Sequence, residues 1–361
     1  MRGVTKPSQE LLRSISDEHV LRALMTSRRL TRAELAVVTG LSKPTVGESV
    51  KRLEELRLVA DTGERTPGGR GKGRVGSFYG LADVGVALVV TIAHDGVTAS
   101  CVDAYGDSVS RVHSPIADPS EVGSVLPIAA VEAVAGQHVR LAVVSAADPV
   151  DRHTGRLVQL PDSPFLVGAL DPVEVLRPFL SGPVIVDNDV NWAAQAERAS
   201  TGVSDFAYLY LGEGLGCALV SDGEVRRGHS GLAGEISHLI TVGPSGAAVP
   251  FIEVFGSLGL RQTGSTAIDV ARLLDSPDLN VVARAIGGVV TALVTLADPE
   301  LVVVGGPWGP LVLDAIGEAC DRLPRHVVVA AASVSSPSFV GARAHALEQL
   351  RNALVEASRS R

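Results

Sequence analysis

The chain has 361 residues, of which 46% are hydrophobic, 20% charged and only 4% aromatic. This composition supports buried cores of aliphatic side chains and excludes a disordered protein. Residues 1–10 lack the apolar segment of a signal peptide, and no apolar run approaches the roughly 20 residues that a membrane span needs. Three scattered cysteines give neither a disulfide framework nor metal-ligand spacing. We therefore expect a cytoplasmic protein with no membrane partner.

The net charge of −8 is unevenly distributed along the chain. Residues 1–80 contain 15 Lys and Arg against 9 Asp and Glu, whereas the remainder contains 17 basic against 31 acidic residues. All four lysines lie in the first segment. A basic head on an acidic body predicts that only the head meets a polyanion.

Three helices are predicted in the head. The first covers residues 17–27, where apolar side chains recur at helical spacing. Thr31 and Glu34 form a capping box for the second helix, whose Leu35 and Val38 should face inward. Gly40 supplies a tight turn. The third helix covers residues 42–56, with Ser42 as its N-cap, and buries three side chains: Val46, Val50 and Leu53.

A helix, a glycine-containing turn and a second helix with a polar N-terminus form the helix-turn-helix pattern. The first turn of the second helix enters the major groove of DNA in that geometry. Ser42, Lys43 and Thr45 are therefore the candidate base-contacting residues. Ser49 and Arg52 are placed on the same outward face, where we expect them to contact the DNA backbone.

A β-hairpin wing is predicted after residues 58–59. Residues 68–74 (GGRGKGR) alternate glycine with Arg70, Lys72 and Arg74, and strand-like residues follow at 78–81. A slim basic segment of this kind suits a narrow, A·T-rich minor groove. The alternatives are a protein-docking module for the three helices and a solvated linker for the glycine-rich stretch.

The body alternates strand-like and helical patterns. These predict two βββαβα-type halves, an α/β architecture with mixed sheets. The expected strands and helices cover residues 87–93, 97–103, 108–112, 122–135, 139–145, 173–180, 184–186, 188 onward, 207–211, 217–220, 281–296, 301–304 and 342–358.

Four motifs in this body follow one another at a specific spacing. They are VDNDVNWAAQAE (186–197), LGEGLGCALVSDGEVRRG (211–228), GLAGEISH (231–238) and PELVVVGG (299–306). With the helix-turn-helix before them, the chain resembles the ROK family (repressors, open reading frames and kinases). It is similar to the regulator branch of N-acetylglucosamine- and xylose-repressor-like proteins. The resemblance implies a winged helix-turn-helix domain over residues 1–81. It also implies a two-lobed, actin-like ATPase domain over residues 82–361, which would bind an effector and form the oligomer.

Two phosphate-binding turns of the family's kinases are altered here. The Asp-x-Gly-Gly-Thr turn aligns with TIAHD (91–95), which lacks both glycines and the first acid. Asp95 and Gly96 resemble an ordinary hairpin turn instead. In the later Gly-Thr-Gly-x-Gly turn, Glu213 replaces the threonine and sets a negative charge against phosphate. We therefore expect no ATP binding, no enzyme activity, no catalytic residue and no cofactor.

The resemblance also implies a set of sugar-binding residues. Asn188 and Asp189 match the Asn-Asp pair whose Asp is the catalytic base in kinases, and Glu235 and His238 match sugar contacts. Glu253 aligns with an acid that follows the family's zinc-binding cysteines. Asn188 and Asp189 also suit a helix N-cap, and His238 and Glu253 also suit ordinary surface positions.

The zinc-binding stretch of the family is changed as well. Residues 241–250 contain no cysteine, and one histidine without thiolates does not make a tetrahedral zinc site. We therefore expect no structural metal. Zinc braces this loop in the family's zinc-binding members. Its loss therefore also affects the expectation that His238 and Glu253 contact the sugar.

Together these features predict a cytoplasmic, nucleoid-associated transcription regulator, a repressor, that binds operator DNA as a homodimer or homotetramer. A sugar or sugar derivative would control its DNA affinity. Two alternatives stay open. One is an active sugar kinase with a regulatory head, and the other is a DNA-binding regulator whose body binds a protein partner instead of a sugar.

Overall fold

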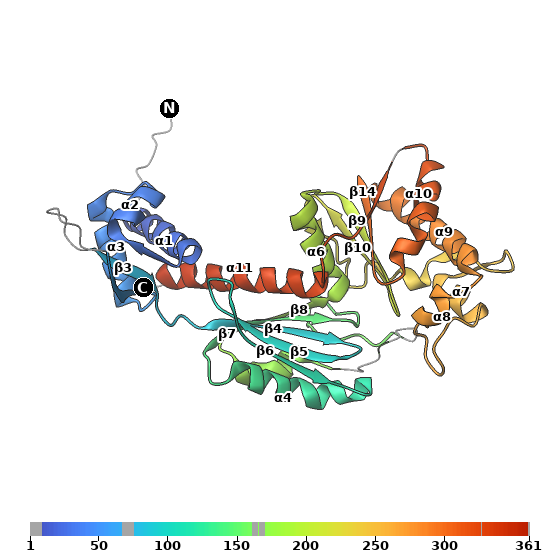
Figure 1. The fold of residues 1–361 in the computed structure, drawn as a ribbon, viewed down its shortest axis with the longest axis horizontal. Coiled ribbons are helices and arrows are strands. Elements are labelled where there is room, and N and C mark those ends of the chain that lie inside the picture. The colour runs from blue at the N-terminus through green and yellow to red at the C-terminus, as the bar shows by residue number, and fades with distance from the viewer. Residues whose placement is uncertain (1–8, 67–75, 161–164, 166–169, 326, 360–361) are drawn as a thin grey trace.

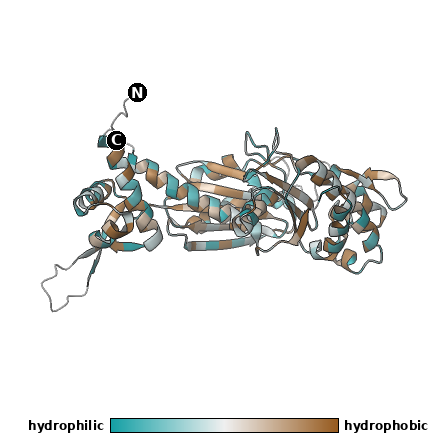
Figure 2. Ribbon diagram, turned by 90° about the horizontal axis from the view of Figure 1, so that it is seen from above, coloured by the Kyte–Doolittle hydropathy of each residue, from teal (hydrophilic) through white to brown (hydrophobic). Residues whose placement is uncertain are grey.

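The computed structural model describes residues 9–66, 76–160, 165, 170–325 and 327–359. A small head, lobe one and lobe two follow one another along the long axis, and helix α11 runs from the lobes back to the head (Figure 1). The head consists of α1 (Gln9–Ser27), β1 (Arg29–Thr31), α2 (Arg32–Thr39), α3 (Lys43–Glu55), β2 (Val59–Arg65) and β3 (Ser77–Leu81). Seen from above, its helices carry both hydrophilic and hydrophobic bands, as amphipathic helices do (Figure 2).

The predicted caps of the head are confirmed. Thr31 and Glu34 form the capping box of α2, and Gly40 ends that helix in the left-handed region with φ 71°. Ser42 caps α3 by accepting a hydrogen bond from the Thr45 amide. The predicted buried stripes of α1 and α3 are also confirmed, and α1 begins eight residues earlier than expected.

One inward-facing prediction in the head is wrong. Val38 is 59% exposed, whereas Leu35 is fully buried. The reason is that the eight-residue α2 inserts Leu35 between α1 and α3, and its last turn extends beyond that core. The three short strands pair in the order β1-β3-β2, which forms the base of a winged helix.

The two lobes repeat one topology. In lobe one the sheet order is β6-β5-β4-β7-β8, with β4, β5 and β6 antiparallel and β7 and β8 added in parallel. In lobe two it is β11-β10-β9-β14-β15, with the same directions. The predicted pair of similar halves is therefore confirmed. Their strands are β4 (Val86–Ala93), β5 (Gly96–Val102), β6 (Ser108–Pro115), β7 (Val139–Ala146), β8 (Val184–Asn188), β9 (Phe206–Leu211), β10 (Leu215–Ser221), β11 (Glu224–Val225), β14 (Leu301–Gly305) and β15 (Val328–Ala331).

Helices cover the sheets and join the lobes. Helix α4 packs on one face of the lobe-one sheet, and α11 packs on the other. Helix α6 lies between the lobes, because Trp192 packs with lobe one while Ala193 and Ala194 pack on the lobe-two sheet. The remaining elements are α4 (Val122–Val134), α5 (Pro172–Leu176), α6 (Asp189–Thr201), β12 (Ile240–Val242), β13 (Ala248–Pro250), α7 (Phe251–Ser257), α8 (Val270–Leu274), α9 (Leu279–Ala297), α10 (Leu313–Asp321) and α11 (Pro337–Arg359).

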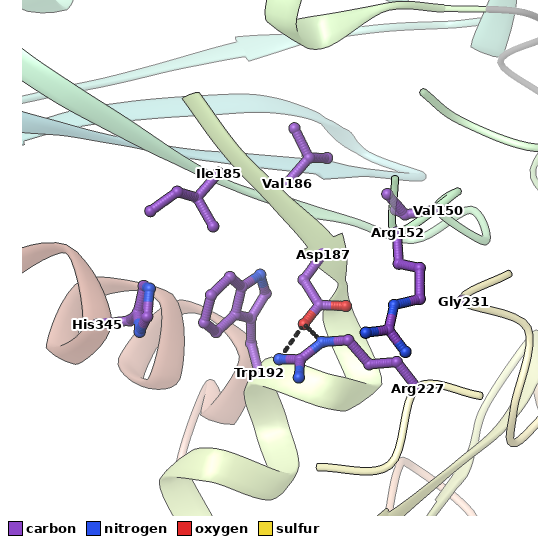
Figure 3. A pocket seen from close by; sticks show the side chains of 9 residues that line it. All are labelled: Val150, Arg152, Ile185, Val186, Asp187, Trp192, Arg227, Gly231 and His345. Carbon is purple, nitrogen blue, oxygen red and sulfur yellow. Dashed lines mark hydrogen bonds and ion pairs between the residues drawn. The ribbon is translucent and has the colours of Figure 1, made fainter. Parts of the chain in front are cut away.

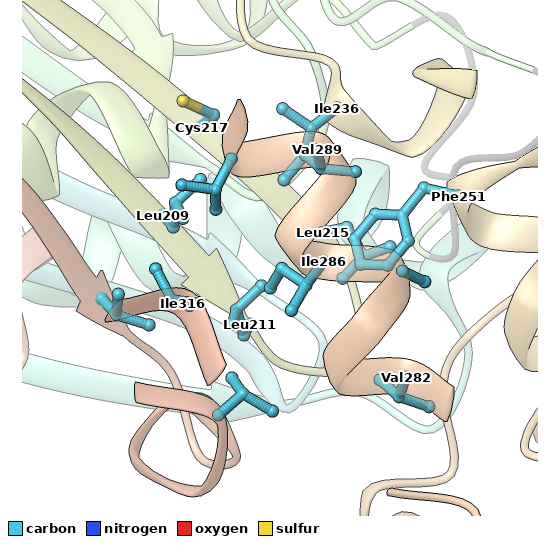
Figure 4. Packing of buried hydrophobic residues seen from close by; sticks show 14 of the residues in the cluster. Leu209, Leu211, Leu215, Cys217, Ile236, Phe251, Val282, Ile286, Val289 and Ile316 are labelled. Carbon is cyan, nitrogen blue, oxygen red and sulfur yellow. The ribbon is translucent and has the colours of Figure 1, made fainter. Parts of the chain in front are cut away.

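Helix α9 corrects one expectation from the sequence. By length and composition it is apolar enough to cross a membrane, so the statement that no run approaches that length is wrong. Its buried side chains, including Val282, Ile286 and Val289, pack against β9, β10 and α7 in the lobe-two core (Figure 4). The apolar run therefore serves a core between the sheet and the neighbouring helices.

Helix α11 ties the head to lobe one. Its Ala342, Ala346, Leu350 and Leu354 are fully buried in a hydrophobic cluster that continues into α1, α2 and α3 of the head. Arg359 near its C-terminus forms an ion pair with Glu18 of α1 at 2.7 Å. A single core therefore crosses the proposed domain boundary between residues 81 and 82.

Candidate DNA-binding face and effector cleft

The N-terminus of α3 forms a polar, exposed end of the head. Ser42 and Lys43 are exposed, and Thr45 is half-buried. The Ser42 and Thr45 hydroxyls lie 2.7 Å apart, so the capping interaction fixes both side chains at the first turn. The Lys43 ammonium is the cation at this end of the helix, where the sequence places the base-contacting residues.

Ser49 and Arg52, the two predicted contacts to the DNA backbone, both bond to Asp17 of α1. Ser49 is fully buried, and its hydroxyl donates a short hydrogen bond to Asp17 of α1. The prediction that Ser49 faces outward is therefore wrong, because α3 turns this side chain toward α1. Arg52 donates to Asp17 at 2.7 and 3.1 Å, and this bonding raises the pKa of the guanidinium. The Asp17 carboxylate thus holds α1 and α3 together.

The wing is present as the β2–β3 hairpin. Arg70, Lys72 and Arg74 lie outside the described residues, so their minor-groove role stays a prediction. Arg65 at the end of β2 forms an ion pair with Asp61 at 2.8 Å, and Arg29 of β1 forms one with Glu64.

Asn188 and Asp189 stand at the junction of β8 and α6, where lobe one meets lobe two. The Asn188 side chain accepts from the Val190 amide at 3.0 Å, which confirms that it is the N-cap of α6. Its amide nitrogen also donates to the Asp148 carbonyl at 3.2 Å. Asn188 is therefore held by both the helix and the loop after β7, which fixes the neighbouring Asp189.

Three carboxylic acids interact at this junction of the two lobes. Burial and the nearby Asp148 raise the pKa of Asp189 to about 7. Burial, followed by the charges of Asp189 and Asp148, raises the pKa of Glu235 to about 7. Asp148 is only 3% exposed. Acids that are protonated near neutral pH can both donate and accept hydrogen bonds, which suits the hydroxyls of a polar ligand.

Sequence reasoning did not single out Asp148. It lies in the loop directly after β7, within an Ala-Asp-Pro segment that none of the recognised motifs includes. The available signal was its position, because the C-terminal ends of parallel strands β7 and β8 meet at one edge of the sheet. Asn188, two residues after Val186, lies at that same edge.

His238 and Glu253 occupy a more open position. His238 ends a short 3₁₀ turn (Ile236–His238) and is exposed. Glu253 lies on α7, is exposed, and forms an ion pair with Arg261 at 3.0 Å. Electrostatic interaction thus joins Asp189 and Glu235, whereas Glu253 is engaged by an arginine of its own lobe.

Comparisons with known proteins agree with this geometry. A model of the ROK family matches residues 121–250, and a model of the MarR family matches residues 19–70. The chain carries a ROK-family domain behind a MarR-like winged helix. It is 24% identical to a xylose repressor of Caldicellulosiruptor bescii over 63% of this chain and 59% of that protein. It is 40% identical to a glucokinase of Halalkalibacterium halodurans over 25% of this chain and 27% of that protein.

A solved structure has the same overall architecture. A ROK family transcriptional regulator, described as a homolog of the E. coli MLC protein, aligns with a TM-score of 0.63 at 16% identity. The alignment covers 96% of this chain and 99% of that one. The fold is therefore a MarR-type winged helix joined to an actin-like sugar-kinase fold. Matches to the first three curated relatives cover 27% to 60% of those proteins.

Residues 91–95, which the resemblance aligns with the first phosphate-binding turn of the family's kinases, lie in a tight hairpin. Strands β4 and β5 pair as far as Ala93 and Gly96, leaving His94 and Asp95 as a two-residue turn. The predicted hairpin is confirmed, but its turn lies one residue earlier than the Asp95-Gly96 pair that was expected. Because Thr91 lies within the paired strand, its backbone amide is not part of an open, glycine-lined loop of the kind that cradles phosphates.

Glu213 lies between β9 and β10, in the turn that the resemblance aligns with the later phosphate-binding turn of the kinases. The turn is closed by a hydrogen bond from the Gly212 amide to the Gly214 carbonyl at 3.1 Å. Two arginines that follow β10, Arg226 and Arg227, pair with Asp222 and Asp187 and not with Glu213. The carboxylate is half-buried and is not neutralised by these cations.

A hairpin forms over residues 240–250, the stretch that the resemblance aligns with the family's zinc-binding cysteines. Strands β12 and β13 pair over residues 240–250, and the Gly243 amide bonds the Ala247 carbonyl at 2.8 Å. Thr241 is buried and donates to the Ala285 carbonyl of α9 at 2.6 Å. Within the described ranges, no group of three or more His, Cys, Asp or Glu could hold a metal ion. Strand pairing and Thr241 thus anchor this loop to lobe two.

Proposed function

We propose that this chain is a DNA-binding transcription regulator, a repressor, whose ROK domain binds a sugar or sugar derivative that controls DNA affinity. The observation that carries the proposal is the MarR-like head, which presents the exposed Ser42 and Lys43 at the capped N-terminus of α3. The excess of basic residues within residues 1–80 supports a polyanionic partner. The protein would act in the cytoplasm as a homodimer or homotetramer.

The effector site would be the cleft of Asp148, Asp189 and Glu235. Its acids suit hydroxyl groups, and their position between the lobes lets a ligand favour one lobe arrangement over another. Through the core that α11 shares with the head, such a change would reach the DNA-binding helices. His238 and Glu253 would contribute at the rim.

The ROK domain would act without phosphoryl transfer. Similar proteins include both xylose repressors and glucokinases. Two features of this chain favour the regulator: the tight hairpin at residues 91–96 and the half-buried Glu213 where the kinases have threonine. A carboxylate at that turn would repel ATP phosphates.

Fluorescence anisotropy with an operator duplex selected from genomic fragments tests the DNA-binding function. Lys43→Ala and Thr45→Ala should each cost about 1–3 kcal/mol of operator binding if they contact bases. Lys51→Ala is the matched control, because that lysine is exposed on the C-terminal half of α3 beside Glu55. Equal operator affinity of all three variants and the wild type would show that the N-terminus of α3 does not contact the DNA bases.

Thermal unfolding with a panel of sugars, sugar phosphates and ATP-Mg tests the effector. A ligand of the native state at 100 times its dissociation constant adds about 2.7 kcal/mol of stability. We expect a shift with a sugar, none with ATP, and loss of the sugar shift in Asp189→Ala.

An active sugar kinase is the second candidate, because the Asn188-Asp189 pair is retained and the chain is similar to glucokinases. ATP consumption dependent on a hexose and abolished by Asp189→Ala would establish it. A response to neither sugar nor ATP, with DNA binding intact, would favour a protein partner for the body.

A further inference from the structure

A polar cavity lies on the α11 side of lobe one, and its lining does not include Asp148, Asp189 or Glu235. It measures about 220 Å³ and is lined by residues of the loop after β7, of β8, α6 and α11, and of the segment of lobe two after β11. The side chains that matter are Arg152, Asp187, Trp192, Arg227 and His345, which converge from these elements (Figure 3). We propose that this cavity binds a small metabolite carrying one phosphate or carboxylate group, and that α11 couples its occupancy to the head.

The charges of the lining favour an anion. Arg227 bonds Asp187 at 2.7 Å, and Asp187 also accepts from the Asn191 side chain at 2.7 Å and from the Asn188 amide at 2.9 Å. This carboxylate is therefore fully engaged. The exposed Arg152 donates to the Gly228 carbonyl at 2.6 Å, and its guanidinium is not engaged by the Asp187 carboxylate that Arg227 holds.

The remaining titratable side chain of the lining, His345, does not cancel the positive charge of Arg152. Burial lowers the pKa of His345, which is therefore neutral near pH 7. Two arginines against one aspartate give the lining a net positive charge. A planar guanidinium is the side chain best suited to bind phosphate or carboxylate through two hydrogen bonds. Arg152 is thus the anchor for the anionic group.

The size and the aromatic wall restrict the ligand further. Pockets for drug-sized ligands span about 300–1,000 Å³, so this cavity of about 220 Å³ suits a small metabolite. The indole nitrogen of Trp192 donates to the Val144 carbonyl at 3.0 Å, so its polar edge is occupied. The ring lies 5.0 Å from that of His345, and together they offer an apolar surface to carbon atoms of the ligand.

Two hydroxyls stand beside this cavity in the sheet. Ser145 pairs with Asp187 in the β7–β8 register, and Thr91 pairs with Ser145 in the β4–β7 register. Both hydroxyl oxygens are buried and form no hydrogen bond with another described residue. Paired residues share a face of a sheet, so the row Thr91–Ser145–Asp187 extends the polar lining inward.

Helix α11 connects the cavity to the head. His345 lines the cavity, and Gly341, one turn earlier, abuts the Trp192 carbonyl so closely that a Cβ would lie 2.0 Å from it. Farther along, Arg351 donates to the Ala104 carbonyl at 2.9 Å and to the Met25 carbonyl of α1 at 3.4 Å. From His345 to Arg351 is only about 9 Å of helix. A ligand that changes the Trp192–His345 contact therefore acts on α11, the helix that also packs against the head and bonds to it.

The binding test uses Trp192 as its own reporter. The chain has two tryptophans, so Trp308→Phe leaves Trp192 as the single emitter. We expect a saturable change in its fluorescence with glucose 6-phosphate or with gluconate at constant ionic strength, and none with glucose. The two anions distinguish phosphate from carboxylate. Arg152→Gln in the same background should weaken binding at least tenfold. Arg156→Gln, which alters an arginine paired with Asp171 outside the cavity, should leave it unchanged.

Three results would overturn the binding proposal. They are no saturable change with either anion, an equal change with glucose, and an unchanged affinity in Arg152→Gln.

The coupling rests on the proposed DNA-binding function and is tested separately, by adding the bound anion to an operator titration. We expect a change in operator affinity in the wild type that is lost in Arg351→Gln, while the Trp192 signal persists. A Trp192 signal without an effect on operator affinity would refute the coupling alone. Failure of all operator binding would refute the proposed function and leave the cavity intact.

Discussion

Replacing Asp189 by asparagine should stabilise the free protein at high pH. Burial and the charge of Asp148 raise the pKa of Asp189 from 3.8 to about 7. The folded protein therefore holds a proton at pH 5 that the unfolded chain releases. This contribution to stability is fully present below pH 4 and is lost as the pH rises through 7. The amide side chain of the Asp189→Asn variant would keep the shape of the acid without carrying its charge.

The magnitude follows from the size of the pKa shift. Between pH 5 and pH 8 the protonated group loses about two pH units of stabilisation, or roughly 2.7 kcal/mol at about 1.36 kcal/mol per unit. Asp189 remains partly exposed, so solvent screening reduces this to about 1–2 kcal/mol. The variant should thus be about as stable as the wild type at pH 5 and about 1–2 kcal/mol more stable at pH 8.

Urea unfolding at the two pH values measures this difference. Asp222→Asn is the matched control, because Asp222 is 85% exposed and pairs with Arg226 at the surface. The free energy of unfolding of Asp222→Asn, relative to the wild type, should not rise between pH 5 and pH 8 as that of Asp189→Asn does. A difference between Asp189→Asn and the wild type that is equal at pH 5 and pH 8 would refute the burial of this carboxylate. The variant should also lose its sugar-induced thermal shift.

Three further variants test the account. Gly341→Ala should destabilise the protein by about 3 kcal/mol in urea unfolding, because its Cβ would meet the Trp192 carbonyl; wild-type stability would show that α11 and α6 pack less closely. Asp17→Ala should cost about 3–5 kcal/mol by leaving Arg52 without its buried partner, and hydrogen exchange should show the loss in α1 and α3; unchanged exchange there would contradict it. Operator affinity should fall steeply as salt rises, and Lys43→Ala should weaken binding to the operator more than to a scrambled duplex; an equal loss on both duplexes would indicate a phosphate contact instead.

The local chemistry of the head was readable from its sequence. Thr31 with Glu34, Gly40 and Ser42 are short-range signals, and each forms the cap that it predicts. Ser49 was misplaced because a polar residue on a helix is ordinarily solvent-exposed. Its burial depends on Asp17, which lies 32 residues earlier and reaches it only through the packing of α1 on α3.

The body shows the same limit. Hydrophobic periodicity predicted most strands of both sheets, because buried parallel strands form continuous apolar runs. Short elements such as β15 and α10 gave too little periodicity to be predicted. At the site, the motifs indicated Asn188, Asp189 and Glu235. Asp148 and the cavity under α11 arise from contacts between segments far apart in the chain, which no local pattern encodes.

The central claim is that this chain reads a DNA sequence. The most direct measurement is an equilibrium competition at physiological salt between the selected operator and a scrambled duplex of the same length and composition. The account predicts that the full chain binds the operator at least about 10³-fold more tightly, as specific regulators do. Equal affinity for the two duplexes would contradict it, because a basic surface alone would then explain all of the binding.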